Sequence, residues 1–156
     1  EQYNLKEEFP FIFAGLAVGV GFATFLNGNF VEKFGMLKLV SIFALIFTLI
    51  SLTYIILYSG KENPDSAILI LFFVLEFFSL GFLFGNLRAL AMEPIGHIAG
   101  IGAAINGFVS TIMAVPIATY IGSFIDTTAL PLFIGFFICG ILTLVLILSL
   151  KFSHKK

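Results

Sequence analysis

The stretch ILILFFVLEFFSLGFLFGN, residues 68–86, decides the fold of this chain. Crossing about 30 Å of hydrocarbon takes roughly 20 mostly apolar residues in a helix, and this run has that length and character. One carboxyl group, that of Glu76, interrupts it. We therefore predict a membrane-spanning helix over residues 66–88 with an acidic side chain near its middle.

The composition of the whole chain agrees with a membrane protein. Of its 156 residues 60% are hydrophobic and only 11% are charged, and the mean hydropathy is +1.12. Globular proteins average about 45–50% apolar and 25% charged residues. The formal net charge of −1 argues against a nucleic-acid partner, because phosphates require a basic surface. The lipid bilayer is the expected surrounding.

Four further apolar runs of similar length accompany the first, and short connectors with turn or charge signals separate them. The five predicted spans are residues 10–29, 37–58, 66–88, 98–124 and 129–150. The predicted fold class is therefore all-α, a polytopic helical membrane protein with five transmembrane helices.

The distribution of Lys and Arg predicts how these spans are oriented. With alternating connectors, one side of the membrane holds six of the eight basic residues, Lys33, Lys38, Arg88, Lys151, Lys155 and Lys156, and the other holds Lys6 and Lys61. The positive-inside rule then places the N-terminus outside and the C-terminus in the cytoplasm. An odd number of spans that starts outside, without Met at residue 1, leads us to expect a preceding helix and a longer protein.

Small residues distinguish the first and fourth spans from the others. In lipid, small side chains let helix backbones approach closely, so we expect spans 10–29 and 98–124 in the interior and the aliphatic spans 37–58 and 129–150 at the periphery. The residues predicted to pack or bend the interior helices are Gly15, Gly19, Gly100, Gly102, Gly107 and Pro116. This alternation resembles the internal repeats of transporters, although any helical bundle with tight crossings uses small residues.

The connector GNFVEKFGMLK, residues 28–38, carries a recognisable pattern. Its members are Gly28, Glu32, Lys33, Gly35 and Lys38, which fit G-x-x-x-[DE]-[RK]-x-G-x-x-[RK]. The glycines permit a tight turn, and the charged side chains can form charge-assisted bonds with helix ends. The pattern resembles the cytoplasmic-loop signature of the major facilitator superfamily, in its second copy between helices eight and nine. The alternative interpretation is an ordinary basic turn.

Two other segments are similar to one branch of that superfamily. NLRALAMEPIGHIAG, residues 86–100, and DTTALP, residues 126–131, resemble segments of the Bcr/CflA drug-resistance transporters. The resemblance covers the whole chain and implies helices eight to twelve, a partial C-terminal six-helix bundle of the major facilitator fold. It further implies proton-coupled multidrug efflux in a bacterial inner membrane, together with an N-terminal half and a helix seven that lie outside this chain.

Glu76 and Asn106 are the candidate residues of a substrate or proton pathway. An ionised side chain at mid-depth costs roughly 2.5–3.5 kcal/mol on insertion scales, so a water-filled cavity, a bound proton or a bonded neighbour should offset that cost. Glu76 could thus couple transport to the proton gradient or attract a cationic substrate, or it could serve structure alone. Asn106 is expected at a similar depth on a neighbouring helix, where it could bond Glu76, a substrate or another helix.

The remaining sequence offers no sign of enzymatic chemistry. No group of His, Cys, Asp or Glu has metal-ligand spacing, and no serine has the partners of a catalytic triad. We therefore expect no metal and no cofactor, with the proton gradient as the energy source and protons and a drug-like amphipathic molecule as partners. Two alternatives remain: a nutrient or metabolite symporter of the same fold, and a non-transporting five-span scaffold.

Overall fold

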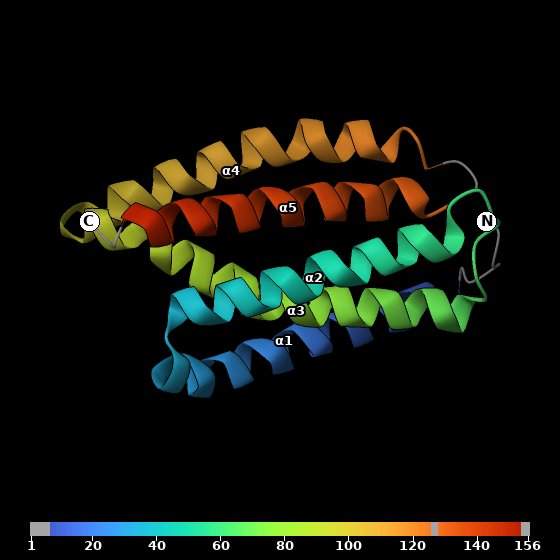
Figure 1. Cartoon of the computed structure of the whole chain (residues 1–156), viewed down its shortest axis with the longest axis horizontal. Coiled ribbons are helices and arrows are strands. Elements are labelled where there is room, and N and C mark those ends of the chain that lie inside the picture. Colours follow the sequence, from blue (N-terminus) through green and yellow to red (C-terminus); the bar gives the residue numbers. More distant parts are fainter. Residues whose placement is uncertain (1–6, 126–127, 154–156) are drawn as a thin grey trace.

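The computed structural model describes residues 7–125 and 128–153, and all secondary structure within them is helical. The elements in chain order are α1 (Phe9–Phe34), α2 (Met36–Tyr58), α3 (Ser66–Met92), the short 3₁₀ helix η1 (Glu93–Ile98), α4 (Ala99–Gly122) and α5 (Leu130–Ser153) (Figure 1). The all-α prediction is confirmed. Asp126 and Thr127, which begin the DTTALP segment, lie outside the described residues.

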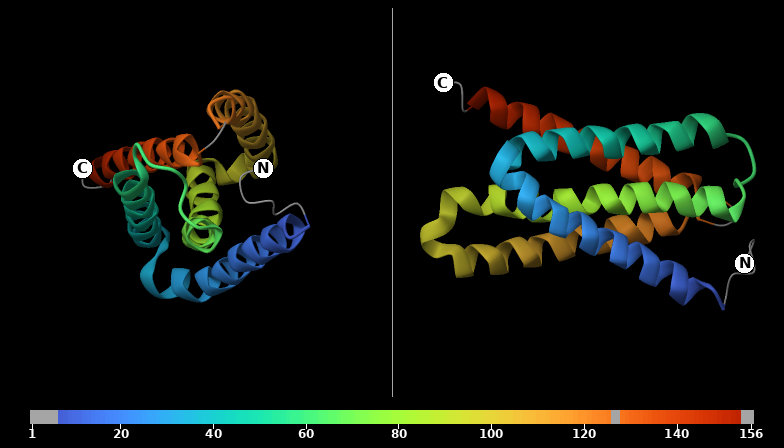
Figure 2. Two further views of the ribbon diagram at one scale, coloured as in Figure 1. Left: turned by 90° about the vertical axis from the view of Figure 1, so that its right-hand side faces the viewer. Right: turned by 90° about the horizontal axis from the view of Figure 1, so that it is seen from below.

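The described residues contain four continuous helical stretches that are long and apolar enough to cross a membrane. They are Phe9–Phe34, Met36–Tyr58, Ser66–Gly122 and Leu130–Lys151. The third contains α3, η1 and α4, and the chain reverses its direction at η1, so that α3 and α4 run antiparallel (Figures 1 and 2). Large apolar side chains cover the outside, as on α1, where Phe11 is 79% exposed. Such a surface indicates a multi-pass membrane protein.

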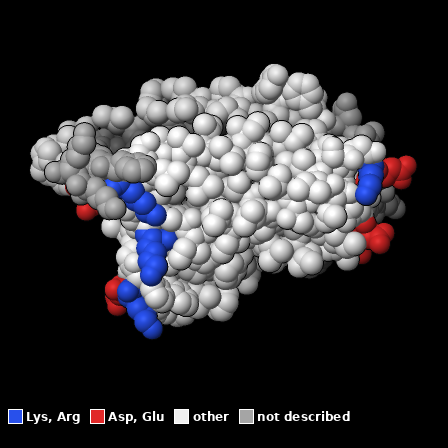
Figure 3. All heavy atoms as spheres, viewed as in Figure 1, with Lys and Arg blue, Asp and Glu red and all other residues white. Residues whose placement is uncertain are grey.

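Charged side chains lie at the two ends of the bundle. Figure 3 shows an uncharged band between them on the face in view. The end at which α1, α3 and α5 finish, here called the basic end, carries Lys33, Lys38, Arg88 and Lys151 together with Glu32 and Glu93. The opposite end, the acidic end, carries Glu7, Glu8, Lys61, Glu62 and Asp65. Because charges avoid hydrocarbon, this separation marks the direction in which the helices cross.

The packing order differs from the one expected from the small residues. α2 packs against both α3 and α5. α1 packs against α3, so α3 lies between α1 and α2, as the end view of Figure 2 shows. The buried apolar cluster is formed by Val40, Ala44, Phe47, Leu83 and Ile147. α1 and α4 thus flank the described bundle and α2 is central, whereas we expected spans 10–29 and 98–124 inside and spans 37–58 and 129–150 outside.

The close helix crossings explain this difference. A Cβ added to Gly81 would lie 2.6 Å from Ala23 Cβ, so α1 and α3 nearly touch there, and one added to Gly140 would lie 3.3 Å from the Cα of Thr48 on α2. Of the glycines singled out for packing, Gly102 meets the side chains of Met92 and Ile95. Within the described part of the chain, a Cβ would meet nothing within 4 Å at the others, Gly15, Gly19, Gly100 and Gly107.

Pro116 lies inside α4, which continues as one helix from Ala99 to Gly122. The residue removes a backbone donor, so the bond to the carbonyl one turn earlier is missing. α4 does not end at Pro116, and the bend expected from this residue stays a prediction.

The connector between α1 and α2 reduces to a single residue, Gly35. Its φ of 79° lies in the left-handed region that favours glycine, so the pattern places glycine where the backbone needs it. Gly28 lies within α1, and Glu32 is exposed on the last turns of that helix. The ammonium groups of Lys33 and Lys38 lie 5.6 Å and 5.3 Å from the ring centroid of Phe34.

Candidate functional site

Glu76 faces a neighbouring helix and is sealed inside the bundle. Its side chain is 0% exposed. Ser51 on α2, also 0% exposed, donates a hydrogen bond from Oγ to Glu76 Oε1. Oε2 is buried as well and has no hydrogen-bond partner among the residues that the structure describes. The carboxyl group is therefore held at one oxygen and unsatisfied at the other, an arrangement that is costly for a buried charge.

The hydrogen bonds around Ser51 can accommodate either protonation state. Ser51 Oγ also lies 3.1 Å from the carbonyl oxygen of Phe47, but a hydroxyl group has only one proton to donate. When Glu76 is ionised, Ser51 donates to Oε1. When Glu76 is protonated, its own hydroxyl can donate to Ser51 Oγ, and Ser51 then donates to Phe47. Both arrangements use the same pair of contacts of Ser51, to Phe47 and to Glu76.

Aromatic rings close the site toward the acidic end. Tyr54 lies one turn beyond Ser51, and its ring stacks on Phe133 of α5 with centroids 3.7 Å apart. Phe72, one turn before Glu76, meets both rings edge-on at 5.2 Å and 6.0 Å. These rings separate the carboxyl group from the acidic end of the bundle.

Rings also lie on the side toward the basic end. Phe47 is 4% exposed, and its centroid lies 5.6 Å from that of Phe136 on α5. Glu76 therefore occupies a small polar layer between two groups of aromatic rings.

The loop after α2 fastens the aromatic layer near the acidic end. Asn63 Oδ1 accepts hydrogen bonds from the hydroxyl group of Tyr54 at 3.3 Å and from the backbone N–H of Ala129 at 2.9 Å. A single amide oxygen thus joins the last turns of α2 to the residue that precedes α5.

The structure does not bring Asn106 to Glu76. Asn106 is half-buried on α4, accepts a bond of 3.2 Å from Ser110 Oγ, and lines a cavity of about 300 Å³ with Arg88 and Ala89. Arg88 lies twelve residues after Glu76, which is ~18 Å along a helix. The prediction of equal depth was wrong because α3 continues to Met92 and leaves sixteen residues beyond Glu76.

A second buried polar contact joins α1 and α3. Asn86 Nδ2 donates to Asn27 Oδ1 at 2.7 Å, and Asn27 Nδ2 donates back to Asn86 Oδ1 at 3.4 Å. Thr24 adds a bond from its hydroxyl group to the carbonyl oxygen of Gly81 at 3.2 Å. Hydrogen bonds thus help to hold α1 on α3, where close packing of the two backbones also contributes.

We expect Asn86→Leu to destabilise the protein by about 1–2 kcal/mol, because it leaves the buried amide of Asn27 without its partner. The double variant Asn27→Leu/Asn86→Leu should recover most of that loss, since neither amide then remains unpaired. Unfolding of the four members of this mutant cycle in mixed detergent micelles measures the effect. Additive single and double effects would show that the two amides act independently.

Four residues of these sites were not predicted from the sequence: Asn27, Ser51, Tyr54 and Asn63. Ser51 could have been predicted from its spacing to Ala44 and Thr48, because positions i, i+4 and i+7 place these small side chains on one face of α2. Thr48 on this face meets Gly140 of α5, and Ser51 meets Glu76 of α3. The face therefore marks α2 as the central helix.

A groove of about 570 Å³ runs between α4 and α5 near the acidic end. Its lining includes Tyr120, Phe124, Ile138 and Leu142 and is apolar throughout. It suits apolar or amphipathic molecules rather than ions.

Comparisons with known protein families, with curated proteins and with solved structures found no match to this chain.

Proposed function

We propose that this chain is part of a proton-coupled exporter of small amphipathic molecules, of the major facilitator type and most like its Bcr/CflA branch. Glu76 is the proton-binding residue in this proposal. The observation that carries it is the buried carboxyl group between two aromatic layers, held by Ser51 at one oxygen and unsatisfied at the other. A carboxyl group used only for structure would be expected to have both oxygens bonded.

The proposal includes five membrane crossings. Because the chain reverses at η1, at the end of the bundle where α5 also finishes, and α4 ends at the opposite end, we take α3 and α4 as one crossing each (Figure 1). The basic end then faces the cytoplasm of a bacterial inner membrane, with α1 starting outside and α5 ending inside. The crossings correspond to helices eight to twelve of the resembled transporters, whose substrate cavity forms against a second half.

The proposed mechanism uses the two hydrogen-bond arrangements of Ser51. A proton bound at Glu76 removes the charge and allows the polar layer to stay closed, whereas loss of the proton leaves a buried carboxylate with one bond. That charge favours opening toward water, so protonation biases a two-state bundle. Asn106, in its cavity beside Arg88, stays a candidate for substrate contact near the cytoplasmic end.

The Ser51 bond also supports a second candidate function. An interhelical hydrogen bond between α2 and α3 is what a non-transporting scaffold needs to hold its helices together. A scaffold would show no dependence on a pH gradient, so transport measurements separate the two.

The test is transport in liposomes that contain the purified full-length protein. With an acidic lumen, a proton antiporter should accumulate ethidium, a permanently charged amphipathic cation, and a protonophore should stop the accumulation. Permanent charge excludes passive trapping of a weak base, and liposomes without protein provide the baseline.

Each other outcome has its own meaning. Accumulation driven by an alkaline lumen instead would identify a symporter of the same fold. Equal ethidium levels with and without protein under both gradients, repeated with other amphipathic cations and anions, would contradict transport and favour the scaffold.

A further inference from the structure

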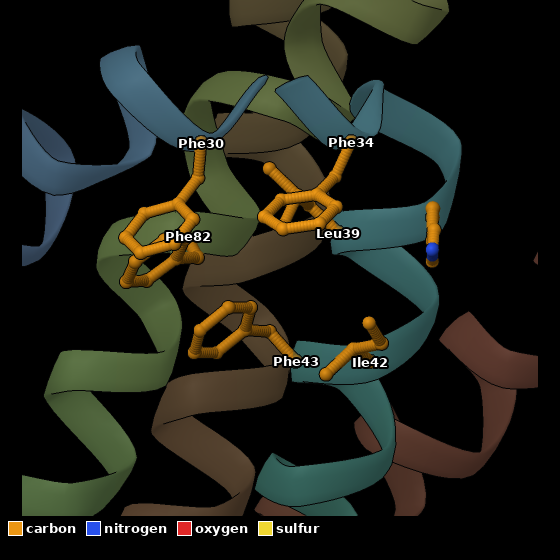
Figure 4. Close-up of a pocket in the computed structure, with 7 residues that line it drawn as sticks. Phe30, Phe34, Leu39, Ile42, Phe43 and Phe82 are labelled. Carbon is orange, nitrogen blue, oxygen red and sulfur yellow. The ribbon is translucent and has the colours of Figure 1, made fainter. Parts of the chain in front are cut away.

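A second pocket opens near the basic end, away from Glu76, and is independent of the proposed transport. It has a volume of about 330 Å³ and lies between α1, α2 and α3. Figure 4 shows Phe30 and Phe34 reaching in from α1, Ile42 and Phe43 from α2, and Phe82 from α3.

The pocket is built from packed aromatic rings. Phe43 and Phe82 stack with their centroids 3.8 Å apart, and Phe82 is only 2% exposed. Phe30, Phe34 and Ile42 are each about 40% exposed and form the rim. A fixed apolar floor with an open apolar rim at the surface of the bundle suits a flexible hydrocarbon chain rather than a polar molecule.

Positive charge gathers at one edge of this pocket. Lys38 lines it, and the ammonium groups of Lys33 and Lys38 both lie within 6 Å of the centroid of the Phe34 ring, at 5.6 Å and 5.3 Å. Glu32 is the acidic residue next to them in sequence, so these three side chains sum to +1. Two like charges drawn to one ring favour an anion between or beside them.

The start of α2 adds to this positive field. Its N-cap is Gly35, and among the described residues no side chain caps the first turn, which also contains no acidic residue. The free N–H groups and the positive end of the α2 dipole therefore lie next to Lys38.

We propose that this pocket binds an anionic phospholipid from the leaflet at the basic end. Its phosphate group lies at the first turn of α2 between Lys33 and Lys38, and one acyl chain lies over the Phe43–Phe82 stack. The lipid satisfies the uncapped N–H groups and the lysine charges at once, while its hydrocarbon chain covers the apolar floor.

None of these 156 residues is Trp, so once any Trp elsewhere in the full-length protein is replaced by Phe, one introduced Trp reports on its own surroundings. Phe30→Trp places the reporter at the pocket rim, and Phe84→Trp, two residues after Phe82 and outside the pocket, is the matched control with 60% exposure at the original residue. The protein is placed in vesicles of phosphatidylcholine with a fraction of either phosphatidylcholine or phosphatidylglycerol brominated on its acyl chains. Quenching by each brominated lipid gives its relative binding constant.

We expect phosphatidylglycerol to be preferred at Trp in position 30 and both lipids to quench equally in position 84. Lys33→Gln and Lys38→Gln should each lower the preference by on the order of fivefold, since each basic residue near the surface contributes about that factor. Lys61→Gln at the acidic end should leave the preference unchanged.

Three results would overturn the proposal. Equal preferences at both Trp positions would mean that the leaflet charge alone attracts the lipid. A preference that survives in the double Lys variant would remove the phosphate site. Quenching at Trp in position 30 that is the same for both brominated lipids, with inorganic phosphate still protecting the wild type against thermal unfolding at constant ionic strength, would show a site for the free ion and not for a lipid.

Discussion

Glu76→Gln is expected to abolish substrate movement driven by a pH gradient while leaving the fold intact. Glutamine has nearly the same shape, and its amide oxygen can accept the same hydrogen bond from Ser51. It cannot bind and release a proton in the range of cellular pH. Uptake of ethidium into liposomes with an acidic lumen should therefore fall to the level of liposomes without protein.

Stability measurements separate this effect from damage to the fold. The free energy of unfolding of Glu76→Gln should lie within about 1 kcal/mol of the wild-type value, the effect expected for one exchanged hydrogen bond. Thermal unfolding in detergent measures it. Exchange of ethidium without a gradient should persist, because only coupling is removed.

Ser51→Ala and Ser79→Ala are the matched controls. Ser51→Ala removes the partner of Glu76 and should lower stability by about 1 kcal/mol but keep the carboxyl group, and hence the dependence on pH. Ser79 lies on α3, the helix of Glu76, and is 1% exposed; its hydroxyl group donates to the backbone carbonyl of Leu75. Ser79→Ala should leave the coupling of transport to the pH gradient unchanged. If Glu76→Gln transports like the wild type with the same pH dependence, Glu76 is a structural residue.

The second large effect is expected from Gly81→Ala. The new methyl group would lie 2.6 Å from Ala23 Cβ and 2.8 Å from the carbonyl oxygen of Val20, and the backbone of α1 cannot yield locally. α1 must therefore move away from α3, which also stretches the bond from Thr24 to the carbonyl of Gly81. We expect a loss of about 1–3 kcal/mol in the free energy of unfolding.

Gly85→Ala provides the control for Gly81→Ala. It lies one turn further along α3, where an added Cβ meets nothing within 4 Å of the described chain. Since alanine is a better helix former than glycine by about 1 kcal/mol, this variant should be as stable as the wild type or more so. Equal unfolding midpoints for the two variants in detergent would show that the crossing of α1 and α3 is not close in solution.

The sequence was sufficient to locate the helices because their limits follow from local properties. Charges and turn residues such as Lys33, Gly35 and Asp65 stand where apolar runs end, and the predicted bounds agree with those of α1 to α5 to within five residues. The order of packing did not follow in the same way. Spans that are apolar on all sides carry no direction toward a core, and lipid supplies no hydrophobic force that would sort them.

What arranges the helices is a few specific contacts whose two partners lie far apart in sequence. Glu76 was recognisable as an unusual residue, but its partner Ser51 resembles any serine in an apolar helix until the helices are placed side by side. The same holds for the amide pair of Asn27 and Asn86. Gly15 and Gly19 show the reverse case, since their spacing suggested a close crossing that does not occur between the described helices.

The amide of Asn63 has a consequence for how the bundle can move. Its oxygen accepts hydrogen bonds from both Tyr54 on α2 and the backbone of Ala129 before α5, and it therefore connects the end of α2 to the start of α5. These two bonds favour movement of the two helix ends as one unit. We therefore expect widening toward the acidic end to begin at α1 or α4, because these two hydrogen bonds involve neither helix.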